Sequence, residues 1–86
     1  MPETIHQEIN GVIEALQELA TDNTIPNGVR TKITTIISSL KDKNIDIAIR
    51  INKVQDELET ITNDSNIPSY TRTQLWNVSS MLEFIQ

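Results

Sequence analysis

Two copies of one short motif hold the side chains of this chain that are best suited to bind an anion or to tie down a loop. The motif is Asp-x-x-Ile-Pro-x-x-x-Arg, and it runs from Asp22 to Arg30 and again from Asp64 to Arg72. The two arginines could hold one anion between them, because guanidinium groups bind carboxylates and phosphates through paired hydrogen bonds. Alternatively, each arginine reaches back to the aspartate or the carbonyl groups of its own loop. We favour this second role, in which these four side chains are loop braces.

The other ionisable side chains offer little material for catalysis or metal binding. Glu3 and His6 have the Glu-x-x-His spacing that places two metal ligands on one face of a helix. Such a site needs further carboxylates, and the aligned positions in the second half of the chain are Ile45 and Ala48. With one histidine and no cysteine, neither a Ser-His-Asp nor a Cys-His set can be assembled. We therefore expect no enzyme activity, no cofactor and no metal.

The motif belongs to a longer repeat, which determines the predicted architecture. Residues 3–44 align without a gap on residues 45–86, and twelve of the forty-two aligned pairs are identical. Self-similarity at a fixed period indicates two copies of one supersecondary unit. The identical pairs are Ile5/Ile47, Ile9/Ile51, Asn10/Asn52, Val12/Val54, Leu16/Leu58, Asp22/Asp64, Ile25/Ile67, Pro26/Pro68, Arg30/Arg72, Thr31/Thr73, Ser38/Ser80 and Leu40/Leu82.

Apolar residues at helical spacing predict two helices in each unit. In the first unit the helices cover residues 4–20 and 27–41. Asn27, Asp46 and Ser69 stand where N-caps of the second, third and fourth helices are expected. The apolar stripes are Ile5, Ile9, Val12, Ile13, Leu16 and Leu19; Val29, Ile33, Ile36, Ile37 and Leu40; Ile47, Ile51, Val54, Leu58 and Ile61; and Thr71, Leu75, Val78, Leu82 and Ile85.

The Ile-Pro pair of each motif predicts a sharp break between paired helices. Proline disfavours the helical conformation of the residue before it, so the preceding helix ends before Ile25 or Ile67. Each isoleucine is then free to close the open end of its helical hairpin, as a hydrophobic staple does.

Two hairpins that each have one apolar face must bury those faces against each other. We therefore predict a single domain, residues 1–86, with an all-α fold: a four-helix up-and-down bundle whose two units are related by approximate two-fold symmetry. The alternative is an open stack of two HEAT-like repeats. We prefer the closed bundle, because two repeats without capping units would leave a stacking face exposed.

The composition of the chain predicts its cellular location and the kinds of partner that it does not bind. The chain has a net charge of −5, and its seven basic residues are scattered, so nucleic acid is not expected as a partner. The closest pair, Lys41 and Lys43, is explained by the favourable effect of cations near a helix C-terminus. No apolar run approaches the ~20 residues that cross a bilayer. The absence of cysteine and of a leader segment predicts a cytoplasmic protein.

Four large apolar residues lie off the predicted stripes: Ile49, Trp76, Met81 and Phe84. The aligned partners of the last three in the first unit are small or polar: Thr34, Ser39 and Asp42. Either the fourth helix is wrapped more deeply than the second, or it presents an interface to a second copy or to another protein.

At the two Asp-x-x-Ile-Pro-x-x-x-Arg loops the chain resembles uncharacterised protein family 0147, a set of short archaeal proteins. The segments that carry the resemblance are DNTIPNGVR and NDSNIPSYTRTQLWNVSSMLE, which include both motifs and Trp76. The resemblance covers essentially the whole chain. It implies a four-helix bundle of the bromodomain-like, up-and-down kind, and it implies no activity, because the family has no assigned function.

Three functional hypotheses follow. The first is a non-catalytic interaction module that forms a homodimer through its fourth helix or binds an unknown protein partner. The second is an accessory of a nucleic-acid machine such as the ribosome, which would use Arg30, Lys32, Lys41 and Lys43. The third is an enzyme, which is retained only because a bundle can enclose a small-ligand site.

Overall fold

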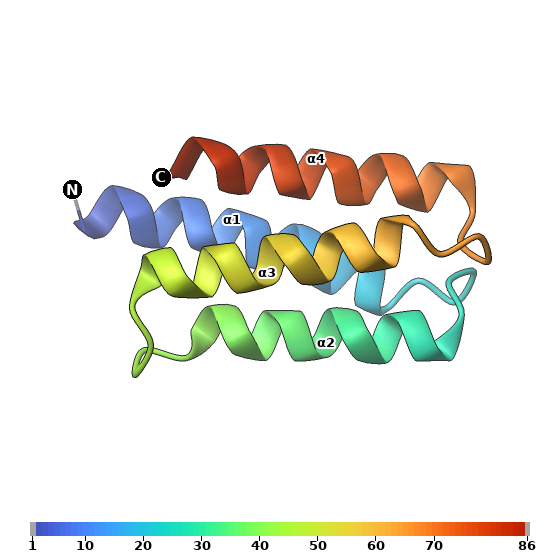
Figure 1. Ribbon diagram of the computed structural model, residues 1–86, viewed down its shortest axis with the longest axis horizontal. Helices are drawn as coiled ribbons and strands as arrows, with labels where there is room; N and C mark the ends of the chain where they lie inside the picture. Colours follow the sequence, from blue (N-terminus) through green and yellow to red (C-terminus); the bar gives the residue numbers. More distant parts are fainter. Residues whose placement is uncertain (1, 86) are drawn as a thin grey trace.

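Four helices make up the computed structural model, which describes the backbone of residues 2–85 and the side chains of residues 7–85. They are α1 (Pro2–Ala20), α2 (Asn27–Lys41), α3 (Ile47–Thr62) and α4 (Ser69–Ile85). The helices alternate in direction, and the bundle measures 37 × 21 × 19 Å (Figure 1). The predicted all-α, four-helix fold is confirmed, and residues 2–85 contain no strand.

Contacts between the first and last helices close the bundle. Helix α1 packs against α2 and α4, and α3 packs against the same two helices, whereas no Cα atoms of the diagonal pairs approach within 8 Å of each other in the part of the chain that is described. An open stack of two hairpins would not bring α1 and α4 together, so this alternative is excluded. Closure lets each helix bury one apolar stripe on two neighbours.

The core is built mainly from aliphatic side chains, with the buried threonines Thr62 and Thr71 beside them. Burying each such side chain stabilises the fold by about 1.5–3 kcal/mol, which a small domain without disulfides requires. Ile47 and Ile85 are half-buried near the ends of their helices, and the side chain of Ile5 lies outside the described residues. The buried apolar residues are Ile9, Val12, Ile13, Leu16, Leu19, Ile25, Val29, Ile33, Ile36, Ile37, Leu40, Ile51, Val54, Leu58, Ile61, Ile67, Leu75, Val78 and Leu82.

All three interhelical loops share one design, although the sequence analysis identified only two of them. The loop between α2 and α3 reads Asp42-x-x-Ile45-Asp46-x-x-x-Arg50, with aspartate in place of proline. In each loop the motif aspartate accepts a hydrogen bond from the backbone N–H two residues later. These bonds join Asp22 to Thr24 at 2.9 Å, Asp42 to Asn44 at 3.0 Å and Asp64 to Asn66 at 2.8 Å.

The helices begin differently from the capping prediction. Asn27 and Ser69 are themselves the first helical residues, and Pro26 occupies the N-cap position of α2. Asp46 does cap α3 by position, but its side chain makes no capping hydrogen bond. At α2 and α4 the prediction failed because the proline before the helix already sets the backbone angle of the entry, so no side-chain acceptor is needed to begin the helix.

We expect the loop isoleucines to contribute strongly to stability, because Ile25 and Ile67 are buried in the core. Ile25→Ala or Ile67→Ala should lower the free energy of unfolding by about 2–4 kcal/mol. The matched control is Ile49→Ala, which removes the same atoms from a side chain that is 59% exposed. It should cost less than about 0.5 kcal/mol. Equal urea midpoints for the loop and control variants would show that these isoleucines do not close the hairpins.

One core position carries a hydroxyl group that forms no hydrogen bond to the described residues. Thr71 is fully buried, and its Oγ1 has no hydrogen-bond partner among the described residues. The aligned residue in the first unit is Val29, which has the same shape without the hydroxyl group.

Thr71→Val should therefore raise the free energy of unfolding by about 1 kcal/mol, because it removes a buried, unpaired polar atom. The control is Thr73→Val, at an exposed position two residues later where the hydroxyl group bonds the Ser69 carbonyl at 3.2 Å. It should leave stability unchanged or lower it slightly. A lower thermal midpoint for Thr71→Val than for the wild type would contradict the assignment.

Candidate functional site

The arginines of the second and third loops hold the ends of the preceding helices. Arg72 donates from Nε to the Thr62 carbonyl at 2.9 Å and from Nη2 to the Asp64 carbonyl at 3.1 Å. Arg50 donates from Nη1 to the Leu40 carbonyl at 2.6 Å. The last carbonyl groups of a helix lack partners within the helix, and they carry the negative end of its dipole. A guanidinium group supplies both the missing hydrogen-bond donors and a positive charge that interacts favourably with the dipole.

Arg30 is arranged differently from its repeat partner Arg72. It donates to the side-chain oxygen of Asn23 at 3.4 Å and to that of Asn27, and both bonds lie at the surface. Its Nε is buried without a partner among the described residues. Each of the two repeat-related guanidinium groups is thus engaged within its own loop, to carbonyl groups in one case and to amide side chains in the other.

The first loop also contains a carboxyl group whose pKa is lowered. Hydrogen bonds from the side chain and the backbone N–H of Thr24 hold the pKa of Asp22 below its ordinary value of 3.8, and the charge of Arg30 adds a smaller effect. Asp64 uses its carboxylate in the same way, accepting the N–H of Asn66. The aspartate carboxylates therefore shape their turns. The arginines donate to backbone carbonyl or asparagine side-chain oxygens and not to these carboxylates.

We expect Arg72 to stabilise the protein more than Arg30 does. Arg72→Ala leaves the partly buried carbonyl groups of Thr62 and Asp64 without their donor, and it should cost about 1.5–3 kcal/mol. Arg30→Ala removes only bonds to exposed amide groups, and it should cost less than about 1 kcal/mol. Chemical denaturation of both variants tests this order. Equal losses, with wild-type stability that rises on adding phosphate, would favour a shared anion site instead.

A basic pocket lies where the second loop meets α1. It has a volume of about 350 Å³, and three of its lining residues are cations: Lys41, Lys43 and Arg50. Of the four bases in the nucleic-acid hypothesis, only Lys41 and Lys43 line this pocket. Lys32 lines a different hollow beside α3, and Arg30 belongs to the first loop, at the opposite end of the bundle (Figure 1).

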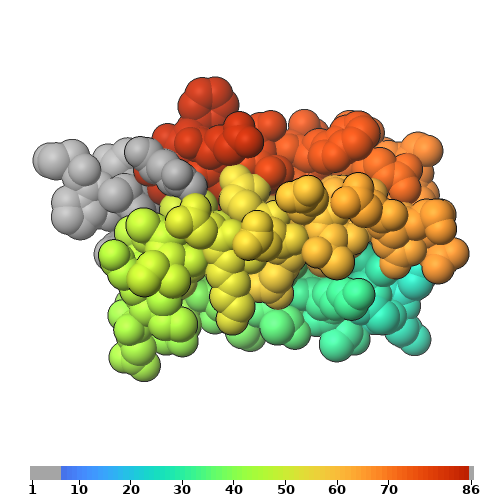
Figure 2. Space-filling model, in the orientation of Figure 1, coloured from blue at the N-terminus to red at the C-terminus, as the bar shows by residue number. Residues whose placement is uncertain are grey.

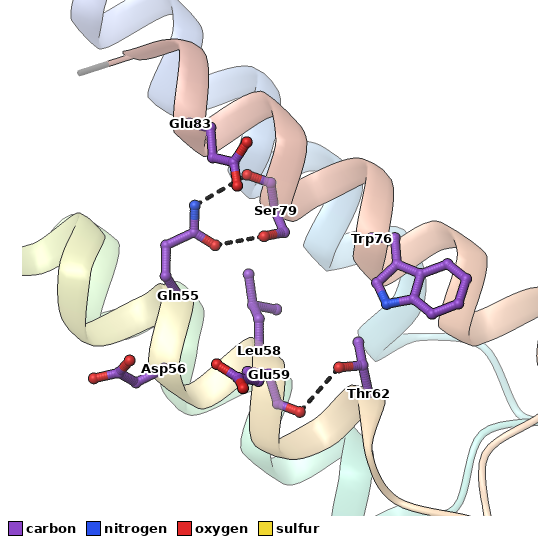
Figure 3. Close-up of a pocket in the computed structure, with 8 residues that line it drawn as sticks. All are labelled: Gln55, Asp56, Leu58, Glu59, Thr62, Trp76, Ser79 and Glu83. Atoms are coloured by element: carbon purple, nitrogen blue, oxygen red, sulfur yellow. Dashed lines mark hydrogen bonds between the residues drawn. The ribbon is translucent and has the colours of Figure 1, made fainter.

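A second hollow, the acidic groove, lies between α3 and α4 (Figure 3). Its volume is about 340 Å³. Gln55 and Ser79 bridge the two helices: Gln55 Nε2 donates to the Ser79 carbonyl at 3.0 Å, and Ser79 Oγ donates to Gln55 Oε1 at 2.6 Å. The indole of Trp76 lies at the Thr62 end of the groove. Carboxylates of Asp56, Glu59 and Glu83 complete the lining.

The four candidate interface residues are all exposed, but they do not form one tight cluster. Met81 and Phe84 line a hollow beside α1, together with Glu8 and Gly11. Trp76 lies on the α3 side of the same helix, in the acidic groove. Ile49 is on the outer face of α3 and lines neither hollow. The structure thus brings Met81 and Phe84 together and separates them from the other two.

The sequence analysis missed Tyr70. Its side chain is 65% exposed, and those of Trp76 and Phe84 are 57% and 86% exposed. The only tyrosine, tryptophan and phenylalanine of the chain are therefore all exposed on α4. The signal was present in the sequence, because all three aromatic residues fall within one predicted helix while the core stripes are aliphatic.

Two further observations concern metals and membranes. The side chains of Glu3 and His6 lie outside the described residues, and no group of three potential metal ligands occurs within the part of the chain that is described. No helix of the described structure combines the length and the apolar character needed to cross a bilayer.

These features define a small all-α domain of the closed four-helix type, with hollows between its helices. The chain belongs to the uncharacterised protein family UPF0147, whose family model matches residues 1–85. No function is assigned to this family.

Two solved structures resemble the chain over nearly its whole length. One is a UPF0147 protein from Thermoplasma acidophilum, with 31% identity, a TM-score of 0.89, and coverage of 94% of this chain and 95% of that one. The other is the protein of unknown function MMP1188, with 28% identity, a TM-score of 0.87, and coverage of 92% and 90%. No curated protein matches the chain.

Proposed function

We propose that this protein is a non-catalytic, cytoplasmic interaction module that self-associates through the outer face of α4. The observation that carries the proposal is the placement of every aromatic residue. Tyr70, Trp76 and Phe84 are all on this helix, and each is more than half exposed. Aromatic residues and methionine are enriched in protein interfaces, where they supply large contact areas.

Helix α4 is available for such a contact. It forms one edge of the bundle, and Figure 2 shows no other element over its outer side in that view. The outer face of α4 consists of exposed, uncharged residues: Tyr70, Thr73, Trp76, Asn77, Ser80, Met81 and Phe84. Glu83 is the only charged residue among the exposed positions of this helix.

Charge favours the outer face of α4 as the surface through which a second copy would bind. Each subunit has a net charge of −5, so two copies repel each other over most of their surfaces. The exposed positions of α1 include three glutamates, Glu8, Glu14 and Glu18, which would oppose one another in a two-fold contact. The outer face of α4 avoids that repulsion, and a two-fold axis would pair it with itself.

The size of this face predicts a weak dimer. A helix of 17 residues is about 26 Å long, so one helical face buries on the order of 300–500 Å² per subunit. That is below the ~800 Å² per partner of a standard interface. We therefore expect dissociation constants in the micromolar range or above, and an equilibrium between monomer and dimer in solution.

Sedimentation equilibrium from micromolar to near-millimolar concentration tests the proposal. The wild type should associate, and Trp76→Glu and Phe84→Glu should each give a folded monomer. The matched control is Thr34→Glu, which adds the same charge at the exposed position of α2 that aligns with Trp76. It should associate as the wild type does.

The single tryptophan supplies an independent measurement. Its emission should shift to shorter wavelength as the wild-type concentration rises, because association removes the indole from water. A wild type that stays monomeric at all concentrations, or a control variant that dissociates as readily as Trp76→Glu, would refute self-association through α4.

A further inference from the structure

The basic pocket between α1 and the second loop combines apolar walls with a cationic rim. Ile9 and Ile13 of α1 and Ile47 of α3 supply apolar walls, and Lys41, Lys43 and Arg50 supply the cations. Its volume of about 350 Å³ is within the usual range of small-ligand sites, which are mostly apolar with a few polar groups. No residue of α4 lines it, so it is independent of the proposed dimer face.

The two lysines are not required by the design of the loop. All three loops share the Asp-x-x-Ile motif, but only the second flanks its aspartate with lysine on both sides. The four corresponding residues of the other loops are uncharged: Thr21, Asn23, Asn63 and Ser65. In a chain with a net charge of −5, three of the seven bases thus line a single pocket.

Arg50 has a fixed position at this pocket. Its hydrogen bond from Nη1 to the Leu40 carbonyl at 2.6 Å anchors the guanidinium group beside the pocket wall. The neighbouring acids do not line the pocket: Asp42 accepts the N–H of Asn44, and Asp46 is exposed at the start of α3. Among the described residues, the charged groups that line the pocket are therefore all positive.

We propose that this pocket binds an amphiphilic organic anion, in which a carboxylate or phosphate group is carried on a compact apolar body. The head group would interact with Lys41, Lys43 and Arg50, and the body would lie against the isoleucine walls. A polynucleotide fits less well, because the other four bases, Arg30, Lys32, Lys53 and Arg72, do not line this pocket and the net charge of −5 repels a polyanion.

Titrations followed by backbone amide NMR test the proposal with four probes: octanoate, octyl phosphate, octanol and inorganic phosphate. Octanoate or octyl phosphate should shift the amide signals of residues 40–50 and of Ile9 and Ile13 at lower concentration than octanol or inorganic phosphate does. Whichever of the two amphiphiles binds more tightly identifies the preferred head group.

Charge variants separate a built site from general attraction. Joint replacement of Lys41 and Lys43 by glutamine should weaken binding of the better amphiphile by about fivefold. The matched control is joint replacement of Lys32 and Lys53 by glutamine, which removes the same two charges from exposed lysines of α2 and α3 outside the pocket. It should change the affinity by less than about twofold.

Three results would overturn the proposal. Equal binding of octanol and octanoate would show a purely apolar hollow. Equal weakening by the control variant would show non-specific attraction to the whole surface. Displacement of the amphiphile by a short RNA, with a steep dependence on salt, would assign these cations to a nucleic acid instead.

Discussion

The fold depends on burying four aliphatic stripes in a chain that has no disulfide and only 86 residues. A small domain exposes a large share of its surface, so each helix must use its whole apolar stripe against two neighbours. The contact of α1 with α4 achieves this by closing the ring of helices. Because leucine, isoleucine and valine fill the interior, Tyr70, Trp76 and Phe84 are left on the surface. The aliphatic core and the aromatic surface therefore have one origin.

Closing the ring requires three sharp reversals of the chain, and the loops solve this problem with the same side chains. The aspartate organises the turn by accepting a backbone N–H, and the arginine comes one turn into the next helix. The isoleucine is buried in the first and third loops and half-buried in the second. Arg50 and Arg72 hold the carbonyl groups of the preceding helix, whereas Arg30 bonds two asparagines. One motif can thus serve helix capping or surface bonding, depending on the residues around it.

The helices were predictable because helical periodicity records which residues face the core, and the loop positions followed from proline. The second loop, between α2 and α3, was missed because it spans the boundary between the aligned units and has Asp46 where the others have proline. The pocket of Lys41 and Lys43 was not predictable, because its walls come from α1 and Arg50 from α3, and only packing brings them together. The Gln55–Ser79 bridge was also not predictable, because its partners are 24 residues apart. In addition, each aligns with an isoleucine in the first unit, so the repeat gave no sign of a polar pair.

Comparing the aligned positions of the two units distinguishes residues that the core requires from residues that it does not. Most positions that face the core keep their apolar character, as Val12 and Val54 or Ile33 and Leu75 do. Exceptions include Ile13/Gln55, Val29/Thr71 and Ile37/Ser79. At outward positions the units differ in chemistry, since Thr34 aligns with the exposed Trp76. The Thr34 position shows that this site in the bundle accepts a small polar residue, so core packing does not require the indole at Trp76. An apolar side chain that stays more than half in water gains little from folding, so Trp76 is a position where the proposed self-association can be tested without disturbing the core.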